Sequence, residues 1–271
     1  MALSKYQVGV LRLLAERRKD GWESYVAGGV ALNQALWAAR LSRDIDLFHD
    51  TDEALAVSWA KDRQRLQASG FSVETVREGA AFVEALVGKN REQVLVQWAR
   101  DSAYRFFQLM EDAVLGLTLH PLDLATNKVL ALAGRLEPRD WVDALECSER
   151  LQRLGYLLWA DCGKDPGYTP DFLLGEAARQ RYAQMELDSL AFEGSPPDAA
   201  DLGRRWKTAV AEARELIAAL PSAKAGCCVL EMDGKVYSEN IDCLRRDLIA
   251  NRILFHAGRI GGVWPTLKNK P

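Results

Sequence analysis

Residues 25–48 read YVAGGVALNQALWAARLSRDIDLF and combine a glycine pair with two nearby acidic residues. Val26 and its neighbours predict a short buried strand that ends at Gly28-Gly29. The apolar residues that follow recur at helical spacing: Ala31, Leu32, Ala35, Leu36 and Ala39. A strand, a glycine turn and a helix N-terminus bring free backbone N–H groups to one place, which suits a phosphate. A turn of this kind is also a common plain connection, so by itself it does not establish a phosphate site.

The acidic residues lie in a predicted strand, Arg43-Asp-Ile-Asp-Leu-Phe48. Residues two apart on a strand point to the same face, so Asp44 and Asp46 converge while Ile45 and Leu47 face the core. Two neighbouring carboxylates favour a cation between them, and Mg²⁺ binds carboxylate and phosphate oxygens. The alternative is a solvated turn after the strand. The glycine pair about fifteen residues upstream favours a metal-dependent phosphoryl-transfer site.

A second block, LDLATNKVLALAGR, spans residues 122–135. Its apolar residues predict an amphipathic helix: Leu122, Ala125, Val129, Leu132 and Leu136. Lys128 and Arg135 are seven residues apart, and we expect them to share another helix face and to present two cations to a triphosphate. The alternative is an ordinary helix with solvated cations.

Pro138 predicts the first turn of the next helix. Asp140, near that helix start, either complements the helix dipole or joins the site. Asp143 lies one turn deeper on the same face, where an ion pair with Lys128 or Arg139 would orient the lysine.

Together these blocks resemble the AbiEii/AbiGii-type nucleotidyltransferases, a branch of the DNA polymerase β-like superfamily. The resemblance rests on Gly-Gly-Val-Ala-Leu from Gly28, on the Arg-x-Ser-x-Asp-x-Asp run from Arg40 to Asp46, and on the Lys/Arg helix followed by Arg-Asp-x-x-Asp. It covers residues 25–146, about half of the chain.

The resemblance implies transfer of a nucleoside monophosphate from an NTP to an acceptor hydroxyl, with Mg²⁺ or Mn²⁺ as cofactor. It also implies a toxin of a toxin–antitoxin or abortive-infection system, a tRNA or other RNA acceptor and a cognate antitoxin. The implied catalytic residues are Asp44, Asp46, Lys128, Asp140 and Asp143. The implied nucleotide-binding residues are Gly28, Gly29, Arg40, Ser42, Lys128 and Arg135, and Asp44 and Asp46 are the implied metal ligands.

One position departs from the superfamily pattern. Many of its members carry a third carboxylate on a neighbouring strand, but the predicted strand Gln93–Ala99 offers Gln97 there. An amide cannot act as a base. Asp101 is the alternative third metal ligand, and Glu84 on the preceding strand is a second alternative.

The whole pattern predicts an α+β fold, with a polymerase β-like sheet core followed by a mainly helical part. Phe71–Arg77, Ala81–Val87 and Gln93–Ala99 read as strands of a meander, with a turn at Gly88-Lys-Asn90. Further on, Asp233-Gly234 predicts a hairpin between residues 227–232 and 235–238. We expect a palm-like domain over residues 1–120 and a mainly helical domain over 121–271 that contributes Lys128, Asp140 and Asp143 to the site.

Composition limits the partners. The net charge of −3 and a pI near 5.8 exclude a broad basic field, so an RNA acceptor would need local patches. Five cysteines without Cys-x-x-Cys spacing predict reduced thiols and a cytoplasmic protein, and no stretch predicts a membrane span. Two alternatives stay open: transfer to a small molecule or a protein side chain, and a non-catalytic nucleotide- or partner-binding module.

Overall fold

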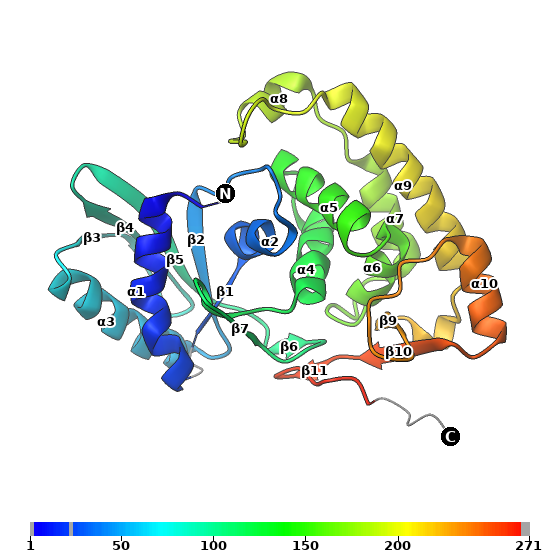
Figure 1. Cartoon of the computed structure of the whole chain (residues 1–271), viewed down its shortest axis with the longest axis horizontal. Helices are drawn as coiled ribbons and strands as arrows, with labels where there is room; N and C mark the ends of the chain where they lie inside the picture. Colours follow the sequence, from blue (N-terminus) through cyan, green and yellow to red (C-terminus); the bar gives the residue numbers. More distant parts are fainter. Residues whose placement is uncertain (1–2, 22–23, 267–271) are drawn as a thin grey trace. The chain divides into compact units, whose positions relative to one another are not determined.

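The computed structural model describes residues 3–21 and 24–266, and the chain divides into two compact units. The first, here called the sheet unit, comprises Met1–Ala103, Gln108–His120 and Ala191–Gly194. The second, the helical unit, comprises Tyr104–Phe107, Pro121–Leu190 and Ser195–Pro271. Figure 1 labels the elements of both units.

A seven-stranded mixed sheet forms the centre of the sheet unit, with strand order β3-β4-β5-β2-β1-β8-β7. The strands are β1 (Tyr25–Ala27), β2 (Asp44–His49), β3 (Ser72–Glu78), β4 (Phe82–Lys89), β5 (Glu92–Arg100), β7 (Met110–Asp112) and β8 (Gly116–Thr118). The helices are α1 (Lys5–Gly21), α2 (Gly28–Leu36) and α3 (Asp52–Ala68). β2 pairs parallel with β5 and antiparallel with β1, so β2 lies in the middle of the sheet.

The two faces of this sheet differ in burial. β2, β4 and β5 each alternate buried and half-buried residues along most of their length. Trp98 of β5 packs on Trp59 of α3 with ring centroids 4.7 Å apart, and its indole N–H donates to Asp62 of α3 at 2.9 Å. The face that carries Trp98 is therefore the core face. The opposite face is half-exposed and is called the open face below.

The predicted meander is confirmed as β3–β4–β5, but its second turn lies further along the chain than predicted. Gly88 and Lys89 continue β4, and the chain reverses at Asn90-Arg91, where both residues have positive φ values of 52° and 69°. A two-residue loop with two positive φ values matches the right-handed twist of the flanking strands.

Among its described residues the helical unit contains seven α-helices, one 3-10 helix and four short strands. They are α4 (Pro121–Gly134), α5 (Pro138–Arg150), α6 (Leu154–Asp161), α7 (Pro170–Arg179), α8 (Gln184–Asp188), α9 (Ala199–Ala219), η1 (Ser222–Lys224), α10 (Ile241–Ile249), β6 (Tyr104–Arg105), β9 (Cys227–Glu231), β10 (Ile253–Ala257) and β11 (Arg259–Ile260). α4 packs against α5, α6 and α7, and α6 packs against α9. Trp141 and Tyr156 are fully buried in this core.

The predicted hairpin around Asp233-Gly234 is only half correct. The turn forms, with Gly234 at a φ of 88°, and residues 235–237 pair with β9 through the Leu230–Val236 bridge and the hydrogen bonds Glu231 N to Lys235 O at 2.8 Å and Tyr237 N to Val229 O at 3.3 Å, but they do not form a regular strand. β9 instead pairs along its whole length with the distant strand β10.

The α+β fold class predicted from the sequence is confirmed, with a mixed sheet and its helices followed by a mainly helical part. Within the described residues, no helix combines the length and the apolar character needed to cross a bilayer. All five cysteines are free thiols.

Candidate functional site

β2 presents Asp44 and Asp46 on the open face of the sheet. The strand alternates in burial, with Ile45 and Leu47 fully buried and the two aspartates half-buried. Asp46 lies in register between Ala27 of β1 and Gln97 of β5. The expected convergence of the two carboxylates on one strand face is therefore observed.

Gly28 begins α2 at a φ of 65° and lies directly against Asp46. A Cβ on Gly28 would come within 1.9 Å of Asp46 Oδ2. The positive φ and this contact both require glycine at position 28. Gly28 therefore leaves space for the Asp46 carboxylate. From the sequence, the glycine pair was expected to leave space for a phosphate.

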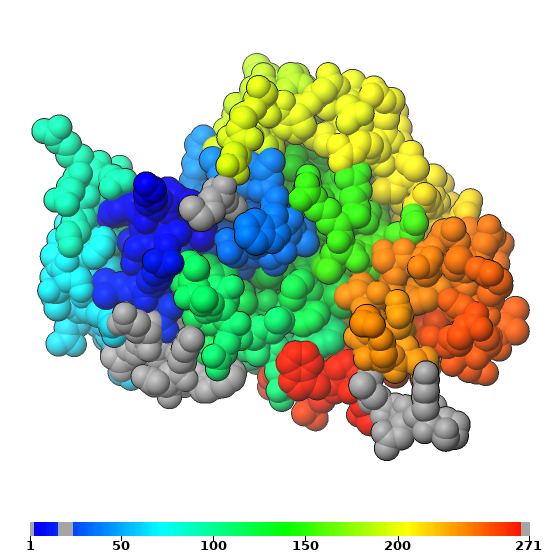
Figure 2. All heavy atoms as spheres, viewed as in Figure 1, coloured from blue at the N-terminus to red at the C-terminus, as the bar shows by residue number. Residues whose placement is uncertain are grey.

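Gly29 is close to the other predicted nucleotide-binding residues. A Cβ there would lie 2.7 Å from Arg40 Nη2 and 2.8 Å from Ser42 Oγ. Arg40 is buried, and Ser42 Oγ donates to the backbone oxygen of Asp44 at 3.3 Å. The glycine pair thus brings Arg40, Ser42 and Asp46 together at the N-terminus of α2, where no side chain caps the helix. The α2 segment reaches the surface of the face shown in Figure 2.

The segment from Arg40 to Ser42 is braced from three distant parts of the chain. Asn33 Nδ2 donates to the Arg40 oxygen at 2.5 Å, and Gln7 Nε2 donates to the Ser42 oxygen at 2.8 Å. Ala191–Gly194 lies alongside, with Leu41 N donating to the Ala191 oxygen at 2.8 Å. No local pattern in the sequence could have predicted this last contact, because about 150 residues separate its partners.

The aspartate pair fits Mg²⁺. Mg²⁺ in nucleotide sites is commonly held by one or two carboxylates together with water and substrate phosphate oxygens, and does not need an all-protein cage. In keeping with this, no group of three or more His, Cys, Asp or Glu side chains able to hold a metal occurs in the described part of the chain. Asp44 and Asp46 would be the protein ligands, and the ion would supply charge stabilisation at the reacting phosphate.

Asp101, the alternative third ligand, is not brought to the pair. Its backbone N–H donates to the oxygen of His49, the last residue of β2, at 3.0 Å. Asp101 therefore lies beyond the end of β2, whereas Asp44 and Asp46 lie at its beginning. The residue beside Asp46 on β5 is Gln97, whose Nε2 donates to Glu84 Oε2 at 2.7 Å.

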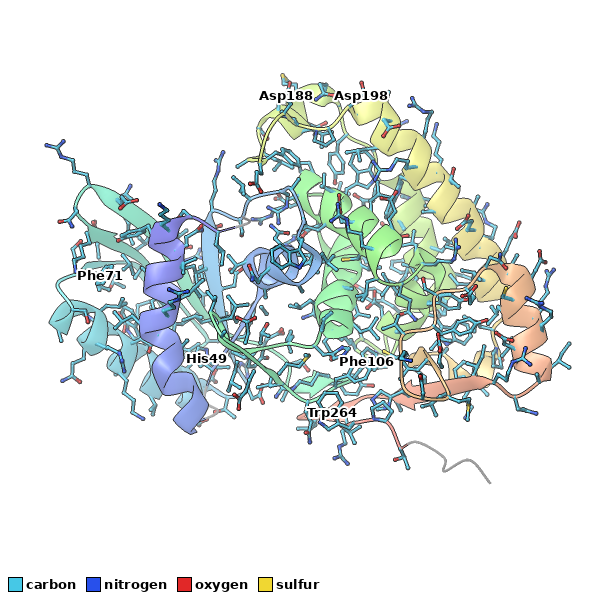
Figure 3. All side chains as sticks on the ribbon, in the orientation of Figure 1. His49, Phe71, Phe106, Asp188, Asp198 and Trp264 are labelled. Atoms are coloured by element: carbon cyan, nitrogen blue, oxygen red, sulfur yellow. The ribbon has the colours of Figure 1, made fainter. Side chains whose placement is uncertain are left out.

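His49, labelled in Figure 3, ends β2 but belongs to the core face. It is fully buried, and its Nδ1 lies 3.2 Å from the backbone oxygen of Ala99. The strand alternation places it on the opposite face of the sheet from Asp46.

In the helical unit, the predicted charged residues form an ionic network around two buried aspartates: Lys128, Arg135, Asp140 and Asp143. Lys128 Nζ lies 3.2 Å from Asp140 Oδ1 and 3.0 Å from Asp143 Oδ2. Arg135 binds Asp140 through two nitrogens, with Nε to Oδ2 at 2.6 Å and Nη2 to Oδ1 at 3.1 Å. Both aspartates are almost completely buried. The predicted ion pair between Lys128 and Asp143 is thus present.

Two details of that prediction were wrong. α4 ends at Gly134, so Arg135 and Leu136 follow the helix, and Leu136 is 74% exposed. Arg135 directly follows the helix, with its N–H donating to the Ala131 oxygen at 3.0 Å, and its side chain reaches Asp140 Oδ1 as that of Lys128 does. The cations are not simply solvated either, because Lys128 is buried between two carboxylates.

The network is electrically balanced, with two cations against two carboxylates. Its field and the surrounding apolar packing act on neighbouring groups. Burial and the nearby Asp143 raise the pKa of the Cys147 thiol well above its usual value. Burial and Asp140 raise the pKa of Tyr182 to about 12. Lys128 and Arg135 are thus neutralised within their own unit before any ligand is considered.

A second buried network in the helical unit was not predicted. Asp123 accepts from the backbone N–H groups of Phe106 and Phe107, each at 2.9 Å, and Lys164 Nζ lies 3.1 Å from Asp123 Oδ1. Phe106 is labelled in Figure 3. Asp161 is fully buried, and neither of its carboxylate oxygens has a hydrogen-bond partner among the described residues. In the sequence, this network is indicated only by the presence of an acidic residue in each of two largely apolar helices, Asp123 in α4 and Asp161 in α6.

No protein-family model and no curated protein matches the chain. Its fold is similar to that of solved structures. A nucleotidyltransferase candidate from Helicobacter pylori aligns with a TM-score of 0.52 and 15% identity, over 80% of this chain and 98% of that one. The nucleotidyltransferase toxin MenT4 from Mycobacterium tuberculosis H37Rv aligns with a TM-score of 0.52 and 17% identity, over 80% and 83%. JHP933 from Helicobacter pylori aligns with a TM-score of 0.50 and 15% identity, over 80% and 95%. The chain therefore has the fold of these nucleotidyltransferase structures.

Proposed function

We propose that this protein is a nucleotidyltransferase that moves a nucleoside monophosphate from an NTP to an acceptor hydroxyl. The acceptor oxygen forms a bond to the α-phosphorus, the bond to the leaving pyrophosphate breaks, and the hydroxyl proton is released. Asp44 and Asp46 hold the divalent cation, Mg²⁺ or Mn²⁺, that such a transfer uses. Gly28, Gly29, Arg40 and Ser42 bind the nucleotide.

One observation carries the proposal. Asp46 lies against Gly28, at the start of an α-helix whose first turn has no side-chain cap. A pair of carboxylates for a cation and free backbone N–H groups for a phosphate therefore occur at one place in the sheet unit. An NTP complexed with a divalent cation needs both.

On the basis of the family resemblance, we propose a role in nucleotide binding and catalysis for four residues of the helical unit: Lys128, Arg135, Asp140 and Asp143. Each cation is already paired within the helical unit. Binding a phosphate would therefore require exchange of one carboxylate partner for the ligand. A purely structural role for this network is the alternative that its burial favours.

The acceptor and the biological role are also proposed from resemblance. The AbiEii-like motifs, and the fold shared with a protein described as a nucleotidyltransferase toxin, support a toxin that modifies the 3′ end of tRNA and is neutralised by a cognate antitoxin. A small molecule or a protein side chain is the alternative acceptor.

The test uses purified protein, Mg²⁺ and each of the four α-labelled NTPs, with and without total tRNA. The Asp44→Ala/Asp46→Ala double variant is the matched control. Label on tRNA with the intact protein alone supports the proposal and names the nucleotide. Label on protein supports the alternative acceptor. Binding of NTP without transfer to any acceptor would support the non-catalytic module.

A further inference from the structure

A row of polar residues crosses the open face of the sheet, starting at Asp46. Asp46 of β2 is in register with Gln97 of β5, Gln97 with Glu84 of β4, and Glu84 with Arg77 of β3. Residues in direct register point to the same face, and neighbouring strands are about 4.8 Å apart. Gln97 thus stands between the carboxylate of the proposed metal site and a second carboxylate one strand further.

The carboxamide of Gln97 can take two orientations, and they have opposite consequences for Asp46. Its N–H₂ end is a donor and its oxygen is an acceptor. With the donor end toward β2, Gln97 would hydrogen-bond the Asp46 carboxylate and compete with a cation for it. With the donor end toward β4, this competition is absent.

Glu84 selects between these orientations. An ionised carboxylate only accepts hydrogen bonds, so Glu84 can bind the N–H₂ end of Gln97 but not its oxygen. The observed bond from Gln97 Nε2 to Glu84 Oε2, at 2.7 Å, fixes the donor end on the β4 side. Among the described residues Arg77 makes no ion pair with Glu84, and its guanidinium lies over the Phe82 ring, 5.6 Å from the centroid.

We propose that Glu84 and Gln97 are a positioning pair for the proposed transfer site: Glu84 holds the amide donor of Gln97 away from Asp46, so that this donor does not compete with the divalent cation for the Asp46 carboxylate. This inference rests on the proposed function. It explains how a glutamine is tolerated beside a metal-binding aspartate. It also leaves the oxygen of Gln97 as an acceptor for a substrate hydroxyl.

Mn²⁺ binding to the free protein, followed by electron paramagnetic resonance, tests the pair without relying on activity. Glu84→Gln should weaken Mn²⁺ binding about tenfold, because the new amide no longer selects one orientation of Gln97 and a charge-assisted bond to Asp46 can form. Gln97→Met, which has no donor, should bind Mn²⁺ as the wild type does. The Glu84→Gln/Gln97→Met double variant should recover wild-type affinity.

The Mn²⁺ affinity of the double variant distinguishes an effect of the Gln97 amide orientation from an effect of the Glu84 charge. If Glu84 acted only through its negative charge, the double variant would bind as weakly as Glu84→Gln, and the proposal would be overturned. Glu74→Gln is the matched control, since it removes an exposed carboxylate from the same face of the edge strand β3 and should change nothing.

The same assay distinguishes failure of the inference from failure of the proposed function. Mn²⁺ binding that is abolished by Asp44→Asn/Asp46→Asn but insensitive to Glu84→Gln would overturn the positioning pair alone. Wild-type protein that does not bind Mn²⁺ would overturn both.

Discussion

The two acidic clusters of this chain look alike in sequence but occupy opposite environments. Asp44 and Asp46 are half-buried on the open face of a sheet, and Asp44 has no ion-pair partner among the residues the structure describes. Asp140 and Asp143 are buried in the helical unit and hold Lys128 and Arg135. The first cluster is half-exposed and suits a cation from solution, whereas the second is buried and already contains its own cations. An Asp-x-Asp or Asp-x-x-Asp motif therefore does not reveal by itself whether the carboxylates are available to a ligand.

The largest contrast is expected from the same substitution made in both clusters. Asp140→Asn removes a fully buried carboxylate that binds both the buried Lys128 and the exposed Arg135, and we expect it to lower the free energy of unfolding by about 3 kcal/mol. Asp44→Asn removes one of two neighbouring like charges at a half-buried site, so the free energy of unfolding should change by no more than about 0.5 kcal/mol. Urea unfolding of both variants measures the difference. Equal losses would show that the aspartate pair is also a structural ion-pair site.

The next contrast concerns two helical glycines with different surroundings, Gly28 at the start of α2 and Gly9 inside α1. Gly28→Ala places a Cβ against Asp46 at a φ of 65°, and should destabilise the sheet unit by about 1–3 kcal/mol while displacing the Asp46 carboxylate. Gly9 lies inside α1, where a Cβ would meet nothing within 4 Å, so Gly9→Ala should stabilise by about 0.5–1 kcal/mol.

Thermal unfolding and Mn²⁺ binding of these two glycine variants give the comparison. Gly28→Ala should lose both stability and metal affinity, whereas Gly9→Ala should lose neither. Retention of metal affinity in Gly28→Ala would show that Asp46 can move aside without leaving the site.

The predictability of the two regions differs for a physical reason. The sheet unit follows from period-two alternation and a glycine turn, which are local signals, and the strand that carries Asp44 and Asp46 was correctly predicted. The environment of Lys128 depends on how α5 packs against α4, which is a tertiary property. The same holds for Arg40, whose neighbour Phe192 comes from a segment far along the chain. Sequence located the charged groups, but only packing determines which of them are neutralised.

Gln97 is a second case in which the sequence located a residue but did not predict its contact. The sequence marked it as a missing carboxylate, and Glu84 as a separate alternative. Strand register joins them into one pair, because β4 and β5 align Glu84 opposite Gln97. A strand boundary misjudged by one residue would have placed Glu84 on the other face, so this contact was beyond sequence reasoning.

The last comparison tests a third environment, a buried carboxylate whose oxygens have no hydrogen-bond partner among the described residues. Burial raises the pKa of Asp161 well above its usual value, although Lys164 acts in the opposite direction. The folded protein then keeps a proton that the unfolded chain releases above a pKa of about 3.9. The stability contributed by this proton is complete below that value and is lost as pH rises toward the folded-state pKa.

Asp161→Asn should remove this dependence, because the amide does not ionise in either state. The free energy of unfolding of Asp161→Asn relative to wild type should therefore increase with pH, by about 1.4 kcal/mol per unit between the two pKa values. Urea unfolding at pH 5, 6 and 7 measures the slope, and the exposed Asp171→Asn in the first turn of α7 should show none. A difference that stays constant from pH 5 to pH 7 would mean that Asp161 is already ionised in the folded protein and paired with Lys164, because the carboxylate is then ionised in both states over this range. Lys164 would then contact Asp161 as well as Asp123, and every buried carboxylate discussed for that unit would lie beside a cation, in contrast to Asp44 of the sheet unit.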